Sequence, residues 1–102
     1  MGWKVIISPS ARTDLEGIVR HVARHNSDAA ARLGYELITR AESVVDFPEI
    51  GRVVPEFKRP NLREVIRSPY RIIYRLRHEE QRIDIVRFWH GARGFPHIPG
   101  AF

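Results

Sequence analysis

The chain has 102 residues, 43% of them hydrophobic and 28% charged, which is typical of one globular domain and excludes a two-domain enzyme. It contains no cysteine, so disulfides, thiolate metal sites and thiol nucleophiles are excluded as well. The net charge of +5 resides in the second half, because residues 52–93 carry eleven basic and five acidic side chains. Fifteen of the seventeen basic residues are arginine, whose planar guanidinium suits carboxylates and phosphates, so we expect an anionic partner for this half.

The first half of the sequence predicts a strand followed by two helices. Residues 3–8 form a short segment rich in β-branched residues, which is typical of a strand. Ser8-Pro9 is a helix start, and apolar residues then recur every three or four positions until about His25. A second start at residues 26–28 begins another amphipathic helix, which Phe47-Pro48 ends. Because only about three residues join the helices, they should form an antiparallel hairpin.

The second half predicts a connector and three strands. Residues 48–60 contain three prolines and a glycine, which exclude continuous regular structure. The hydrophobic period is then two over residues 62–67, 70–77 and 83–89, with short polar turns between them. The predicted fold class is therefore α+β in the order βααβββ, with the helix hairpin packed on one face of a small, largely antiparallel sheet. We place this single domain at residues 1–93 and interpret residues 94–102 as a C-terminal tail or a loosely docked strap.

The strand over residues 70–77 predicts two faces of different character. Side chains two residues apart share a face, so its aromatic and aliphatic residues should bury against the helices. Its arginines would then lie on an open, charged face of the sheet. This face could bind an anionic partner, or it could be an ordinary solvent-facing sheet surface with arginine–glutamate pairs. The residues expected to bury are Tyr70, Ile72, Tyr74 and Leu76, and the arginines opposite them are Arg71, Arg75 and Arg77.

Signatures of metal and hydrolase sites are weak. His21 and His25 have a metal-ligand spacing, but neither a following glutamate nor a cysteine completes a site, so we expect no metal and no other cofactor. His90 differs, because it ends the last predicted strand beside arginines. It is interpreted either as a general base or as a structural histidine that fixes the strand end.

Several motifs together resemble the RelE/ParE superfamily, the small toxins of bacterial type II toxin–antitoxin modules. The resemblance covers about residues 5–93. The connector, the strand over residues 70–77 and the motif after the last strand look most like the ParE and plasmid-stabilisation branch. The motifs are Ser8-Pro9 in the first helix, Phe47-Pro48-Glu49-Ile50-Gly51-Arg52 in the connector, Tyr70-Arg71-Ile72-Ile73-Tyr74-Arg75 in a strand and His90-Gly91-Ala92-Arg93 at the end.

The resemblance implies a growth-inhibitory toxin that a cognate antitoxin neutralises. Members of the ParE branch are described as blocking DNA gyrase, so gyrase is the expected target. The antitoxin is expected to bind through an acidic C-terminal segment and to form a hetero-oligomer with the toxin. The residues expected to contact antitoxin or target are Arg63, Arg67, Arg71, Arg87 and Arg93.

Two alternatives remain open. The first is RelE-like cleavage of mRNA on the ribosome, for which Glu56, Arg71 and His90 could act as base, phosphate clamp and acid. The second is a stand-alone nucleic-acid-binding module, suggested by an isoelectric point of about 10.4, although the arginine face lacks aromatics for base stacking. No apolar run is long enough to cross a membrane, so we expect a cytoplasmic bacterial protein with no membrane partner.

Overall fold

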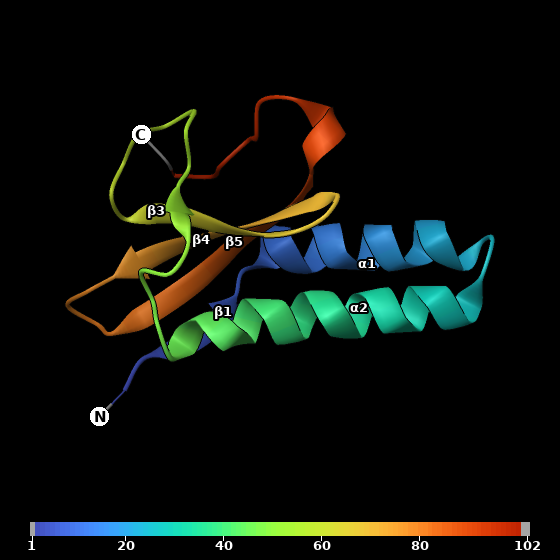
Figure 1. The fold of residues 1–102 in the computed structure, drawn as a ribbon, viewed down its shortest axis with the longest axis horizontal. Helices are drawn as coiled ribbons and strands as arrows, with labels where there is room; N and C mark the ends of the chain where they lie inside the picture. The colour runs from blue at the N-terminus through green and yellow to red at the C-terminus, as the bar shows by residue number, and fades with distance from the viewer. Residues whose placement is uncertain (1, 101–102) are drawn as a thin grey trace.

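The computed structural model describes residues 2–100 and confirms the predicted α+β fold (Figure 1). Two short 3-10 turns, η1 and η2, follow the second helix and the last strand. In the described part of the chain, no helix has the length and apolarity that a membrane span requires. The elements are β1 (Lys4–Ile7), α1 (Pro9–Ala23), α2 (Ser27–Glu42), η1 (Ser43–Val45), β2 (Arg52–Val53), β3 (Leu62–Arg67), β4 (Tyr70–Arg77), β5 (Arg82–His90) and η2 (Gly91–Arg93).

Both helices begin at the predicted capping residues. The Ser8 side chain accepts a hydrogen bond from the backbone N–H of Ala11 at 3.1 Å. The Asn26 side chain accepts one from the N–H of Ala29 at 3.0 Å. Each cap satisfies a donor that has no partner within its own helix, which fixes where the helix starts. Local sequence therefore positions the helix hairpin.

The sheet has five strands in the order β1-β5-β4-β3-β2. β1 is parallel to β5, whereas the other neighbouring strands are antiparallel. β2 lies in the connector, where the sequence predicts no regular structure, because a two-residue strand has no hydrophobic period. Both helices cover one face of the sheet, and the connector and the C-terminal segment lie over the other (Figure 1). We call these the helix face and the far face.

A hydrophobic core lies on each face of the sheet. The alternate residues of β4 that were predicted to bury lie in the core on the helix face: Tyr70, Ile72, Tyr74 and Leu76. The expectation of an open far face is wrong, because Ile73 of β4 packs there against Val54 of the connector and Ile98 of the C-terminal segment. Ile98 is only 1% exposed, so residues 94–100 form a docked strap. The prediction failed because the covering segments are irregular and their apolar residues follow no period.

A β-bulge changes the direction of side chains along β5. Ile73 pairs with Arg87 and Tyr74 pairs with Ile85, so Val86 is an extra residue on β5. Ile85 is buried in the core on the helix face and Val86 in the core on the far face. Beyond the bulge, every side chain lies on the face opposite to the one that simple alternation predicts.

Candidate functional site

Arg71 lies at the centre of an ion-pair cluster on the far face. Its Nε donates a hydrogen bond to Glu64 at 2.6 Å, and its two terminal nitrogens donate to Glu56 at 2.8 and 2.7 Å. Arg52 donates to the other oxygen of Glu64 at 2.6 Å. The Glu64 side chain is fully buried and that of Arg71 is 12% exposed. Two arginines and two carboxylates therefore neutralise one another within this chain.

Strand pairing assembles most of this cluster. β2 places Arg52 directly opposite Glu64 of β3. β4 places Arg71 opposite Ile66, which follows Glu64 by two residues on β3 and therefore shares its face. Glu56 comes from the connector, which folds over the far face. The position of Glu64 gives a signal that sequence analysis missed. Glu64 and Leu62 are two residues apart on one strand and therefore share a face of the sheet, where Leu62 is buried. A carboxylate buried on that face requires a cation beside it.

The charges of Glu56 and Arg71 stabilise each other. The hydrogen bond from Arg71 lowers the pKa of Glu56 below its ordinary value of 4.5. The same hydrogen bond, followed by the one to Glu64, raises the pKa of Arg71 despite its burial. Both side chains are therefore ionised at neutral pH.

We expect the free energy of unfolding to be constant near neutral pH and to fall in acid. Burial by itself would raise the pKa of Asp84, but the hydrogen bonds from Arg82 and Arg77 and the positive charges of these residues together lower it below its ordinary value, as for Glu56. A carboxyl group whose pKa is lower in the folded protein stabilises the fold above its unfolded pKa, which is 4.5 for Glu56. This stabilisation is lost as the pH falls through the lower, folded value.

Urea denaturation at about pH 7, 5 and 3 measures this effect. The stability should be similar at the first two values and clearly lower at the third. Glu56→Gln should reduce the loss in acid, because the variant has one carboxyl group fewer to protonate. Equal stability at all three values would contradict the prediction.

His90 lies on the opposite face of the sheet from Arg71. Its ring packs edge-on against Tyr70, with 5.2 Å between centroids, and its Nδ1 accepts a hydrogen bond from the Ala92 N–H at 3.0 Å. His90 lines a surface groove of about 330 Å³ with Thr13, Ile18 and His21 of α1 and with Arg93. The structure thus brings Glu56 and Arg71 together but does not bring His90 to them. The bulge in β5 is the cause, because uninterrupted alternation from Ile83 would put His90 on the far face.

The other arginines of the predicted interface also have partners within the chain. Arg67 donates to Glu36 of α2 at 2.9 and 3.1 Å in an exposed pair. Arg63 donates to three backbone carbonyls, including that of Gly51 at 3.0 Å. Arg93 lies over the Trp89 ring, with its central carbon 3.8 Å from the centroid.

Asp14 holds Arg87 and closes an edge of the sheet. β1 pairs with β5 only as far as Ile85, so within residues 2–100 the next part of β5 has no neighbouring strand on that side. Asp14 replaces the strand there, accepting hydrogen bonds from Arg87 at 2.6 and 2.7 Å and from the Phe88 N–H at 3.1 Å. The side chains of Asp14 and Arg87 are 9% and 12% exposed. Sequence analysis did not find this pair, because 73 residues separate its members.

Comparison with known proteins identifies the family. A sequence model of the family described as "ParE toxin of type II toxin-antitoxin system, parDE" matches residues 5–95. The chain belongs to the ParE toxin family. This ParE-family toxin is also 32% identical over 95 residues to Toxin RelE1 of Caulobacter vibrioides, covering 89% of this chain and 96% of that toxin. The predicted membership of the RelE/ParE superfamily is confirmed, and the protein is a toxin of a type II toxin–antitoxin module.

Two solved structures share the fold of this ParE-family toxin. The chromosomal ParDE system from P. aeruginosa superimposes with a TM-score of 0.70 at 19% identity, covering 86% of this chain and 95% of that chain. The RelBE2 toxin–antitoxin complex from Mycobacterium tuberculosis superimposes with a TM-score of 0.65, also at 19% identity, covering 88% and 99%. The two neighbours come from both branches of the superfamily, so they establish the fold and not the cellular target.

The part of the toxin that the structure describes, residues 2–100, contains no group of three side chains able to hold a metal ion. The candidate site on the far face consists of arginines and carboxylates. On the far face these groups are already paired. On the helix face, the groove beside His90 combines an imidazole, a hydroxyl and a guanidinium with the carboxylate of Asp14, which accepts hydrogen bonds from Arg87 and the Phe88 N–H.

Proposed function

We propose that this ParE-family toxin stops growth by binding DNA gyrase rather than by cutting RNA. The observation that carries this proposal is the state of Arg71, the candidate phosphate clamp of a ribonuclease. Its guanidinium donates hydrogen bonds to two carboxylates of its own chain, Glu56 and Glu64. A scissile phosphate would have to displace Glu56 and would approach against the negative charge of both acids.

The position of His90 also favours binding over cleavage. A general acid or base must lie within hydrogen-bond reach, roughly 2.6 to 3.2 Å, of the proton that it transfers. His90 lies across the sheet from Arg71, so the two side chains cannot act on one phosphate in this conformation. A toxin that blocks an enzyme by binding needs no such geometry.

We further infer that a cognate antitoxin with an acidic C-terminal segment binds this toxin in a hetero-oligomer. Its net charge of +5 favours an acidic partner. The two solved structures compared above are described as a toxin–antitoxin system and a toxin–antitoxin complex. An interface of at least about 1,600 Å² is expected, because a segment that folds on binding wraps a large surface.

Two parallel assays test the proposed function. Purified toxin is incubated with gyrase and plasmid DNA, and separately with translating ribosomes. We expect inhibited supercoiling and intact mRNA. His90→Ala should inhibit gyrase within a few-fold of wild type, whereas loss of general acid–base catalysis typically lowers a rate by about 10²- to 10⁴-fold. Cleaved mRNA that disappears with His90→Ala, together with unaffected supercoiling, would contradict the proposal.

A further inference from the structure

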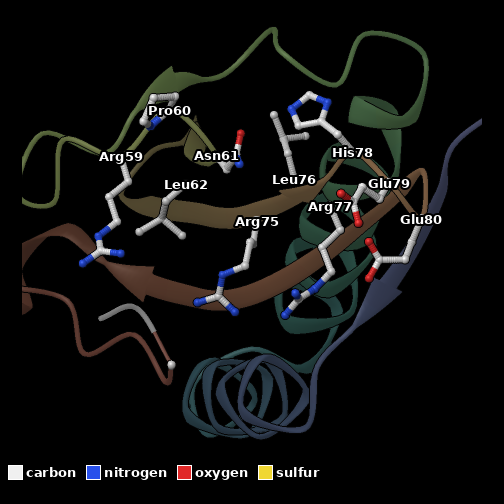
Figure 2. Close-up of a pocket in the computed structure, with 11 residues that line it drawn as sticks. Arg59, Pro60, Asn61, Leu62, Arg75, Leu76, Arg77, His78, Glu79 and Glu80 are labelled. Carbon is white, nitrogen blue, oxygen red and sulfur yellow. The ribbon is translucent and has the colours of Figure 1, made fainter.

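A cleft of about 630 Å³ lies where the connector meets the start of β3 and the end of β4 (Figure 2). Three arginines line it, and their guanidinium groups extend in the same direction along one side of β4 (Figure 2). Pro60, which is exposed, contributes apolar surface to the same cleft, whereas Leu62 and Leu76 lie beneath it in the two cores. The three arginines are Arg59, Arg75 and Arg77.

The charge of Arg75 is not balanced by the residues that the structure describes. Arg77 is paired with Asp84 at 2.6 Å, and Asp84 is also held by Arg82. Within residues 2–100 the recorded partner of the Arg75 guanidinium is a backbone carbonyl, that of Pro99 at 3.0 Å. Burial, followed by the charges of Arg77 and Arg59, lowers the pKa of Arg75, and Asp84 opposes this only in part. The cleft therefore has an unmet requirement for negative charge.

Arg75 differs in this respect from the arginines of the predicted interface. Arg67, Arg71 and Arg87 each have a carboxylate partner in the chain. An incoming anion would have to break an existing ion pair at each of those positions. At Arg75 and Arg59 it would add one, with no pair lost among residues 2–100 and little further dehydration of the half-buried Arg75 guanidinium.

The lining of the cleft selects among anions. Glu79 and Glu80 lie at the end of the cleft beside Arg77 (Figure 2). A nucleic-acid backbone carries a phosphate at every nucleotide, so it would meet these acids wherever it continued through the cleft. A single carboxylate near Arg59 and Arg75 avoids them. The exposed Pro60 can at the same time cover an apolar side chain next to that carboxylate.

We propose that this cleft binds an acidic, apolar peptide segment, with a carboxylate between Arg59 and Arg75 and a neighbouring apolar side chain against the exposed Pro60. The segment is assigned to the antitoxin, and this assignment rests on the proposed antitoxin partnership. The cleft lies at one end of the strands, separate from the Arg71 cluster and from the groove beside His90.

NMR titration of the full chain with a capped synthetic peptide, in which glutamates alternate with leucines, tests the cleft directly. We expect the Nε–H signals of Arg59 and Arg75 to shift. Arg59→Gln and Arg75→Gln should each weaken binding about tenfold or more, the usual effect of losing a hydrogen bond between charged groups. Arg20→Gln, an equal charge change on the exposed surface of α1, should leave the affinity within twofold. A peptide with serine in place of leucine should bind more weakly.

The variants separate this proposal from a general loss of structure and from the gyrase proposal. Arg59 is exposed, so Arg59→Gln should melt like wild type even if Arg75→Gln is less stable. Both variants should still arrest growth. A short oligothymidylate that binds these arginines more tightly than the peptide would overturn the proposal in favour of nucleic acid. Unshifted arginine signals at saturating peptide, or a folded Arg59→Gln that no longer arrests growth, would also overturn it. The titration contains no gyrase, so its result is independent of the target.

Discussion

Arg71→Met is expected to lower the free energy of unfolding by about 3 to 5 kcal/mol, the usual effect of removing one partner from a buried ion pair. Glu64, the partner that remains, has no exposed side-chain surface. In the variant, Arg52 would be the remaining ion-pair partner of the buried Glu64 charge among residues 2–100, and Glu56 would lose both hydrogen bonds from Arg71. Urea denaturation of the two proteins at neutral pH measures the difference.

Arg67→Met is the matched control for this change. Arg67 lies on the neighbouring strand, and its pair with Glu36 is exposed, with the two side chains 32% and 49% accessible. The control should therefore cost less than about 1 kcal/mol. Glu64→Leu combined with Arg71→Met should recover much of the loss, because it removes the isolated buried charge. Equal losses for the two single variants would show that burial does not determine the effect.

Asp14→Ala should destabilise the fold to a similar extent, about 3 to 5 kcal/mol. The substitution leaves the largely buried Arg87 guanidinium without its carboxylate and the Phe88 N–H without its acceptor. Both losses occur at the same edge of β5, so the contact between α1 and the sheet should weaken. Thermal or urea unfolding measures the stability, and hydrogen exchange at Phe88 reports on the edge itself.

The control for Asp14→Ala is Glu16→Ala. Glu16 is an exposed acid on the same helix and has no recorded ion-pair partner among the described residues, so its removal should change stability by less than about half a kcal/mol. The loss of stability in Asp14→Asn should lie between those of the two alanine variants, since an amide keeps one oxygen acceptor but has no charge. If Asp14→Ala unfolds like Glu16→Ala, the ion pair with Arg87 does not hold α1 to the sheet.

These two ion pairs also bear on how the toxin meets its partners. Arg71 and Arg87 were expected to contact an antitoxin or a target, and both are instead held by carboxylates of the toxin. A partner that used them would have to compete with Glu56 or Asp14. The prediction that they form part of an interface therefore stays a prediction. In the proposed cleft, by contrast, no carboxylate of residues 2–100 is paired with Arg75.

The sequence by itself determined the order of the two helices and the four longer strands, both helix starts and the core on the helix face, but not the short strand β2. These features are local, because a cap acts within one helical turn and a hydrophobic period within one element. Ser8 and Asn26 act as predicted, and the alternation over β4 buries Tyr70 to Leu76 as predicted. The family motifs are likewise short runs of sequence, so the toxin class could be recognised before the structure.

Only the tertiary structure decided which charges meet and which face each site residue occupies. Asp14 reaches Arg87, and Glu56 reaches Arg71, through chain folding that no local period encodes. The strap covers the far face through Ile98, one apolar residue in an irregular segment. The bulge at Val86 has the largest consequence, because a single extra residue reverses the faces of the end of β5. It places His90 across the sheet from Arg71, since strand side chains alternate with a period of two and one insertion inverts that order.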